Sequence, residues 1–217
     1  TGLPFNSVIA LELHGGKPLS PLVNAGAIAT TSLINAENTE QRWQRILHIQ
    51  QQLAGEQVAL SDEVNQSEQT TNFHNRAIAW LLYSAGYLYC DAMEACDVYT
   101  RQCSTLINTV ELATLGATLA AGGVNPLTHK RVLQADNVPY ILAEMMMEGL
   151  YGRSGDWAYR VGLPGKSGVG GGILAVVPGV MGIAAFSPPL DEEGNSVRGQ
   201  KMVASVAKQL GYNVFKG

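Results

Sequence analysis

A Lys-Ser-Gly triplet at Lys166, Ser167 and Gly168 opens a glycine-rich stretch of the chain. Four glycines between positions 168 and 172 leave the main chain bare, so a ligand could approach its N–H groups closely. Such N–H groups can hold the oxyanion of an acyl-transfer reaction. An aromatic hydroxyl, Tyr151, precedes the triplet. A β-bulge that requires glycines beside a solvated lysine is the alternative that this short motif leaves open.

A carboxylate and a carboxamide, Glu68 and Asn75, stand seven residues apart in a stretch that we expect to be one helix, at about 63–89. Two helical turns would place them on one face, roughly 10 Å apart along the axis. Together they could bind a free amino acid, because a carboxylate complements its ammonium group and an amide can donate to its carboxylate. An exposed polar face is the alternative.

Asn24 precedes a run of small apolar residues at 25–33 that predicts a buried helix. Asn is a good N-cap, so the simplest interpretation of Asn24 is the start of that helix. His74 has no second His or Cys at ligand spacing, and Cys90, Cys96 and Cys103 lack the C-x-x-C pattern of a zinc site. We therefore expect no metal and no organic cofactor.

The remaining elements follow from periodicity and turn signals. Helical patterns occupy 38–53, 106–121, 136–147 and 196–210. Strand-like runs occupy 158–161, 172–177 and 180–186, and Pro178-Gly179 predicts the turn between the last two. Helices followed by strands and a closing helix indicate an α+β or mixed α/β fold with a largely antiparallel sheet flanked by helices. Residues 1–150 form the mainly helical region and residues 151–217 the sheet region, which we expect to act as one catalytic domain.

The composition limits the partners. The 217 residues are 46% hydrophobic, only 15% are charged, and the net charge is -4, which argues against a nucleic-acid partner. No apolar run reaches the ~18 residues that a membrane span needs, so we expect no membrane partner. Three cysteines are an odd number and favour reduced thiols, which indicates the cytoplasm.

Four separated motifs in one order resemble the glutaminase family, whose members share the β-lactamase-like fold of the penicillin-recognising serine hydrolases. They are Pro-Leu-Val-Asn-Ala-Gly-Ala-Ile at 21–28, the helix from Ser67-Glu68 to Asn75, Asp-Val-Tyr at 97–99 followed by Cys103-Ser104, and Gly-Leu-Pro-Gly-Lys-Ser-Gly-Val at 162–169. The likeness covers nearly the whole chain.

The resemblance implies a role for each matching residue. A clamp for the glutamine α-amino and α-carboxyl groups would comprise Asn24, Glu68, Asn75 and Tyr99. Tyr151 would be catalytic, reaching both substrate and nucleophile, and Val169 would offer its backbone N–H. The implied partner is L-glutamine, hydrolysed to L-glutamate and ammonia through a serine acyl-enzyme, in a homo-oligomer that is a dimer or a tetramer.

One feature of the resemblance is missing. It implies a Ser-x-x-Lys nucleophile upstream of Asn24, whereas the sequence opens at Thr1 without such a segment or an initiator methionine. Its one Ser-x-x-Lys, Ser205 to Lys208, falls on the predicted closing helix, which packs behind the sheet in this fold. We expect the nucleophile segment to precede Thr1 and Ser205 to be uninvolved. The alternatives are a β-lactam or D-Ala-D-Ala hydrolase, a non-catalytic amino-acid-binding protein, and an assembly module.

Overall fold

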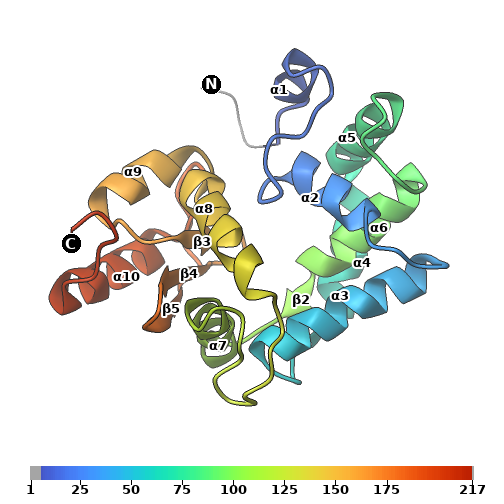
Figure 1. Cartoon of the computed structure of the whole chain (residues 1–217). Coiled ribbons are helices and arrows are strands. Elements are labelled where there is room, and N and C mark those ends of the chain that lie inside the picture. The colour runs from blue at the N-terminus through green and yellow to red at the C-terminus, as the bar shows by residue number, and fades with distance from the viewer. Residues whose placement is uncertain (1–5, 217) are drawn as a thin grey trace. The chain divides into compact units, whose positions relative to one another are not determined.

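The computed structural model of the protein describes residues 6–216. The chain divides into two compact units, whose elements are labelled in Figure 1. The first unit comprises Thr1–Gln50 and Gln57–Leu106, and the second comprises Gln51–Glu56 and Ile107–Gly217. The chain therefore passes between the units around residues 50–57 and again at 106–107.

The first unit is mainly helical. Its helices are α1 (Val8–Leu13), α2 (Asn24–Ser32), most of α3 (Thr39–Ala54), α4 (Asp62–Thr71), α5 (Phe73–Ser84) and α6 (Ala92–Cys103). Two short antiparallel strands, β1 (Ala59–Leu60) and β2 (Thr105–Leu106), pair with each other. The buried side chains of Ile28, Ile78, Leu82 and Ala95 join α2, α5 and α6 in one core cluster. This core fixes the helices that carry the predicted clamp residues.

The predicted helix at 63–89 is wrong, because the structure breaks it at Asn72. Helix α4 ends at Thr71, α5 begins at Phe73, and Asn72 has a non-helical ψ of 30°. The Asn72 side chain donates from Nδ2 to Thr100 Oγ1 on α6, at 2.9 Å. Asn also has a low helix propensity, which suits it to a position between two helices. Glu68 and Asn75 therefore lie on different helices, not on one helical face.

The second unit surrounds an antiparallel sheet with the strand order β3-β4-β5. Its strands are β3 (Gly165–Ser167), β4 (Gly172–Val177) and β5 (Met181–Phe186). Its helices are α7 (Thr109–Ala120), η1 (Ala135–Asn137), α8 (Val138–Glu148), η2 (Tyr151–Arg153), α9 (Ser154–Arg160) and α10 (Val197–Leu210). The predicted strand at 172–177 and the turn after it are confirmed, since Val177 pairs with Met181 across Gly179, whose φ is 76°.

Helices cover both faces of the sheet. Alternate β4 residues point to opposite faces, so Ile173 packs in a core cluster with Val203 of α10. On the other face, a Cβ on Gly116 of α7 would lie 2.6 Å from Leu174 Cδ1 and 3.0 Å from Gly182 Cα. Only glycine permits so close an approach of helix and sheet. The predicted fold class, an antiparallel sheet flanked by helices, is confirmed.

The closing helix is predicted correctly and one strand is not. Helix α10 begins after Ser196, whose Oγ accepts from the Gly199 N–H at 3.1 Å, as an N-cap does. The predicted strand at 158–161 is instead the end of α9. Trp157 and Val161 are buried one helical turn apart, and Trp157 Nε1 donates to the Leu163 carbonyl at 2.7 Å. A window of four residues cannot distinguish this helical period from a strand.

Candidate functional site

The predicted site residues fall into two groups, one in each compact unit. Asn24, Glu68, Asn75 and Tyr99 belong to the first unit, and Tyr151 and Val169 belong to the second. Each group has its own geometry, and the two are built by different kinds of interaction.

Asn24 and Asn75 form an amide pair in the first unit. Asn24 is the first residue of α2, and its Nδ2 donates to Asn75 Oδ1 at 2.8 Å. The predicted placement of Asn24 at the start of this helix is confirmed, but the N-cap position belongs to Val23 and no side chain caps the helix, so the interpretation of Asn24 as the cap is wrong. Within residues 6–216 the pairing leaves the side-chain NH₂ group of Asn75 and the side-chain Oδ1 of Asn24 without another hydrogen bond. The pair therefore presents a donor and an acceptor to a ligand.

Glu68 and Tyr99 differ in their surroundings. Glu68 lies exposed on α4, and in the described part of the chain no ion pair or hydrogen bond joins its carboxylate to another residue. Tyr99 is only 9% exposed and belongs to the core cluster that includes Ile78 of α5. The structure thus joins Asn24 to Asn75 directly and leaves the Glu68 carboxylate available for an ammonium group.

Tyr151 has an unusual backbone conformation in the second unit. Its φ is 53°, in the left-handed region that costs a non-glycine residue roughly 1–2 kcal/mol. Ser154 holds this conformation from both sides. Its Oγ donates to the Tyr151 carbonyl at 2.9 Å and accepts from the Leu150 N–H at 3.0 Å. Strain of this kind concentrates at functional sites, where the surroundings compensate for it.

The Tyr151 phenol lies against the Lys-Ser-Gly strand. Its hydroxyl donates to the Ser167 carbonyl at 3.4 Å, and the Lys166 ammonium donates to the same oxygen. The Lys166 Nζ lies 4.6 Å from the centroid of the Tyr151 ring, within range of a cation–π interaction. Lys166 is partly exposed, and its contacts with the Ser167 carbonyl and the Tyr151 ring show that it is not a fully solvated lysine. We call Tyr151, Lys166, Ser167 and Val169 the phenol site.

Val169 lies in the turn between β3 and β4. Gly168 donates to the Gly172 carbonyl at 3.0 Å and Gly171 to the Gly168 carbonyl at 2.9 Å, whereas the Val169 N–H donates to no group among residues 6–216. A Cβ placed on Gly194 would lie 3.4 Å from Val169 Cγ1 and 3.9 Å from Tyr151 Cε2. Tyr151 and Val169 thus come together beside Gly194, a residue whose role the sequence did not reveal.

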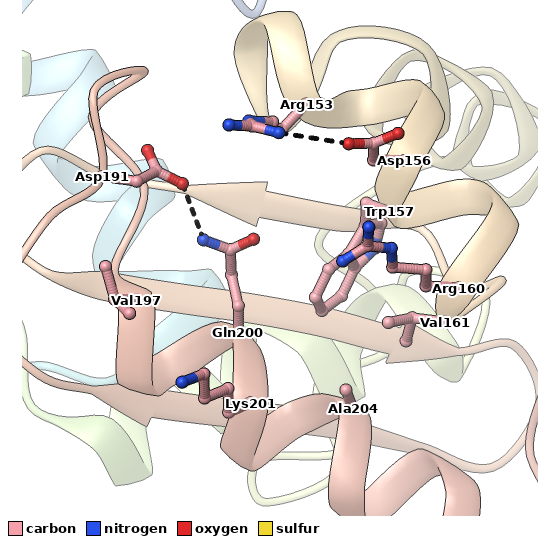
Figure 2. A pocket seen from close by; sticks show the side chains of 10 residues that line it. All are labelled: Arg153, Asp156, Trp157, Arg160, Val161, Asp191, Val197, Gln200, Lys201 and Ala204. Carbon is pink, nitrogen blue, oxygen red and sulfur yellow. Dashed lines mark hydrogen bonds and ion pairs between the residues drawn. The ribbon is translucent and has the colours of Figure 1, made fainter.

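The carboxylate of Asp191 builds the turn that carries Gly194. It accepts from the backbone N–H groups of Glu193 and Asn195 at 3.1 and 2.9 Å. It also accepts from Gln200 Nε2 at 3.0 Å, a bond that is drawn in Figure 2. Burial alone would raise the pKa of Asp191, but these hydrogen bonds to the ionised form outweigh it and hold the pKa below its ordinary value. An ionised Asp191 therefore positions Gly194 beside the phenol site.

The Ser-x-x-Lys sequence of α10 lies apart from this chemistry. Helix α10 buries Val203 and Ala207 against the sheet, whereas Ser205 and Lys208 are exposed. Ser205 Oγ accepts from Gln209 Nε2 at 3.0 Å, one turn along the same helix. Ser205 thus lies on the closing helix, as we expected from the sequence.

Among residues 6–216, no group of three His, Cys, Asp or Glu side chains is arranged to hold a metal ion. Over the same residues, no helix has the length and apolar character that crossing a membrane requires.

Comparison with known proteins gives consistent results. The family model for glutaminase matches residues 1–215. A glutaminase of Escherichia coli O81 is 99% identical over 217 residues, which are all of this chain and 70% of that protein. The solved structure of a probable glutaminase, ybaS, superposes with a TM-score of 0.99 at 98% identity, covering 100% of this chain and 70% of that one.

A more distant relative was solved with a ligand. The Bacillus subtilis glutaminase YbgJ, in a covalent complex with 5-oxo-L-norleucine formed from 6-diazo-5-oxo-L-norleucine, has a TM-score of 0.88 at 31% identity. The alignment covers 97% of this chain and 79% of that one.

Proposed function

The chain belongs to the glutaminase family, and we propose that its two groups of site residues divide the work of glutamine hydrolysis. The enzyme is an amidohydrolase of β-lactamase-like fold that cleaves the side-chain amide of L-glutamine to L-glutamate and ammonia. The observation that carries the division is that the side chains of Tyr151 and Val169 come together beside Gly194, where the Val169 N–H donates to no group among residues 6–216. That arrangement suits acyl transfer, and the first unit suits recognition of the amino-acid end.

The first unit binds the α-amino and α-carboxyl groups in this proposal. The free NH₂ of Asn75 donates to the α-carboxylate, and the carbonyl oxygen of Asn24 accepts from the α-ammonium. The Glu68 carboxylate supplies the opposite charge for that ammonium, which makes their hydrogen bond stronger than a neutral one. Tyr99, whose side chain packs in the core cluster of the first unit, completes the clamp in this proposal.

The second unit performs the chemistry. A serine hydroxyl attacks the amide carbon. Tyr151, as the phenolate, takes the hydroxyl proton and returns it to the departing nitrogen, so that the C–N bond breaks, ammonia leaves and the phenolate is regenerated. Water then attacks the acyl-enzyme, and glutamate and the serine are released. The Val169 N–H and the N–H of the serine hold the oxyanion, and one such donor is typically worth about 3 kcal/mol. We propose that the serine comes from a Ser-x-x-Lys segment preceding Thr1.

Lys166 and Ser167 prepare Tyr151 for this role. Both the phenol and the ammonium are bound to the Ser167 carbonyl, so the ring has one orientation. A cation close to a phenol stabilises its deprotonated form, and that phenolate is the form that can accept a proton from the serine. The 4.6 Å contact of Lys166 with the Tyr151 ring supports this function for the phenol site.

The test is the rate of ammonia release from glutamine by the complete protein carrying Tyr151→Phe. Phenylalanine keeps the ring beside Lys166 and removes only the hydroxyl. We expect kcat to fall by about 10²-fold or more, the usual contribution of a general base. As a control for β-lactamase activity, the wild type and the variant are both assayed with nitrocefin. We expect the rate of nitrocefin hydrolysis to be near zero in both. A kcat within a few-fold of the wild type would exclude Tyr151 from the proton path.

The remaining expectations concern the whole protein. We propose that residues 1–150 and 151–217 work as one catalytic domain, in a cytoplasmic homo-oligomer, a dimer or a tetramer, without nucleic-acid or membrane partners. Burial raises the pKa of the Cys96 thiol, which favours a neutral, unreactive thiol. Light scattering during gel filtration would measure the oligomeric state, and a monomer would contradict the proposed homo-oligomer.

A further inference from the structure

Asn195 is a fully buried residue that the proposed mechanism does not use. It directly follows Gly194, and its exposed fraction is 0%. Its backbone N–H donates to Asp191 Oδ1 at 2.9 Å, and its side-chain Nδ2 donates to the Leu150 carbonyl at 3.3 Å. Asn195 therefore connects the turn that carries Gly194 to the residue that precedes Tyr151.

The orientation of the Asn195 amide follows from its two neighbours. Its Nδ2 lies 3.3 Å from the Leu150 carbonyl oxygen and 3.4 Å from Asp191 Oδ1. A carbonyl and an ionised carboxylate accept hydrogen bonds and cannot donate them. The opposite orientation would place the Asn195 oxygen against both acceptors. The amide NH₂ group must therefore face the Leu150 carbonyl.

The Leu150 carbonyl belongs to the peptide group that sets the φ of Tyr151. This group is planar, so an oxygen that is held in place also fixes the Tyr151 nitrogen, about whose bond to Cα the φ angle is measured. The oxygen accepts from the Arg153 N–H at 3.0 Å as well as from Asn195. One main-chain bond and one side-chain bond thus hold this peptide group.

Ser154 holds the two peptide groups that flank this one. It is only 3% exposed, and its bonds to the Leu150 N–H and the Tyr151 carbonyl are therefore shielded from solvent. The φ of Tyr151 is 53°, whereas a residue in an ordinary α-helix has a φ of about −63°. Loss of these bonds would let the backbone relax toward an ordinary φ. The Tyr151 ring would then turn away from Lys166 and the Ser167 carbonyl.

From these contacts we infer that Ser154 and Asn195 are positioning residues for glutamine hydrolysis, because together they hold Tyr151 in its left-handed conformation. Both side chains are buried, and neither is assigned a contact with the substrate. Asn195 also belongs to the turn whose Gly194 lies beside the Tyr151 and Val169 side chains. The same turn thus supports both parts of the phenol site. This inference rests on the proposed function, in which Tyr151 transfers the proton.

Steady-state kinetics of Ser154→Ala in the complete protein test the inference. The variant loses both bonds beside Tyr151, and we expect kcat for ammonia release to fall about tenfold or more, since misplacing a reacting group by ~1 Å can cost about 10²-fold. KM should stay within a few-fold, because the phenol acts in the chemical step. Asn195→Ala removes one of the two bonds to the Leu150 carbonyl, so its kcat should fall less, about fivefold.

The matched control is Thr118→Val, which removes another buried hydroxyl from the second unit. Thr118 lies on α7, at the opposite face of the sheet, and its hydroxyl donates to the Leu53 and Thr114 carbonyls at 3.1 and 2.9 Å. This variant should lower the Tm about as much as Ser154→Ala does and leave kcat unchanged. If Thr118→Val lowered kcat as much as Ser154→Ala, the effect would be one of general stability and the inference would be overturned.

The same substitution in the Tyr151→Phe protein shows whether Ser154 acts through the phenol. Without the hydroxyl, the position of the ring no longer affects proton transfer. Ser154→Ala should then lower kcat further by no more than about twofold, so that the two substitutions are strongly non-additive. An equal fall of kcat in both backgrounds would overturn the inference, because Ser154 would then act independently of the phenol.

These measurements separate the inference from the proposed function. If Tyr151→Phe lowers kcat but Ser154→Ala and Asn195→Ala keep it within about twofold of the wild type, the inference fails and the function stands. If Tyr151→Phe itself keeps kcat within a few-fold, the proposed function fails and the inference falls with it. If either alanine variant does not fold, Ser154→Cys or Asn195→Thr replaces it. These side chains are of similar size and lack the original hydroxyl or amide, so the same fall in kcat is expected.

Discussion

The amide pair of the first unit and the phenol site of the second are built in different ways. Asn24 and Asn75 are joined by one bond between side chains, at 2.8 Å. The phenol site depends on the main chain: the φ of 53° at Tyr151, the Ser167 carbonyl and the Val169 N–H. A substitution of one recognition side chain removes one contact with the substrate. In a site that depends on the main chain, a displacement of the backbone removes several contacts together. Substitutions in the two units should therefore differ in kind.

The largest effect should come from Gly149, which fixes the backbone of the phenol site. The Ser167 N–H donates to its carbonyl at 2.9 Å, and a Cβ on Gly149 would lie 1.7 Å from the Gly165 carbonyl oxygen. Gly149→Val must displace β3, so we expect a loss of about 3 kcal/mol in the free energy of unfolding, the upper end of the usual cost of overpacking, and no measurable activity. Urea unfolding and ammonia release measure the two effects.

Gly155→Ala provides the control for that substitution. A Cβ on Gly155 of α9 would meet no atom within 4 Å. Alanine there should stabilise the helix by roughly 0.5–1 kcal/mol and preserve activity. Equal effects of Gly149→Val and Gly155→Ala would show that the backbone of the phenol site tolerates displacement.

A substitution in the clamp should act on binding alone. Glu68→Gln removes the charge that faces the substrate ammonium, and the lost charge-assisted hydrogen bond is worth about 1.5–3 kcal/mol. We expect KM for glutamine to rise about 10- to 100-fold with kcat within a few-fold. Glu63→Gln, at another exposed glutamate of α4, should leave both constants unchanged. An unaltered KM in Glu68→Gln would remove this residue from the clamp.

A smaller, pH-dependent effect should follow from Asp191→Asn. The folded-state pKa of Asp191 is lowered, so its ionised form contributes stability above the unfolded pKa of about 3.9, and this contribution is lost as the pH falls through the folded value. The variant should have a lower Tm than the wild type at pH 7, and the difference should shrink below about pH 4. Asp136→Asn, at an exposed aspartate, is the control. A difference that is constant from pH 7 to pH 3 would contradict the account.

The sequence predicted those elements whose signals are local. The Pro178-Gly179 turn delimits two strands, and Ser196 and Gly211 delimit α10. The break at Asn72 escaped prediction because its cause is a bond to Thr100, which is 28 residues away. Helix α6 has no counterpart among the predicted helices, although Asp91 caps it through hydrogen bonds to two backbone N–H groups. Local signals thus placed the second unit better than the first.

The site shows the same limit. The motifs identified Tyr151 and Val169, but not Gly194, beside which both side chains lie, nor the Ser167 carbonyl that holds the phenol. The left-handed φ of Tyr151 was not predicted, although the Ser154 hydroxyl that holds it is only three residues away, because a serine at that spacing does not by itself indicate such a conformation. The bond between Asn24 and Asn75, in contrast, joins residues 51 positions apart.

Steady-state kinetics of Tyr151→Phe beside Asn75→Ala, both in the complete protein, test the division of labour most directly. The account predicts that Tyr151→Phe lowers kcat about 10²-fold or more with little change in KM, because the phenol acts in the proton transfer. Asn75→Ala should raise KM about tenfold or more and keep kcat within a few-fold, because the amide binds the substrate equally before and during the reaction. The same pattern of kcat and KM in both variants would contradict it.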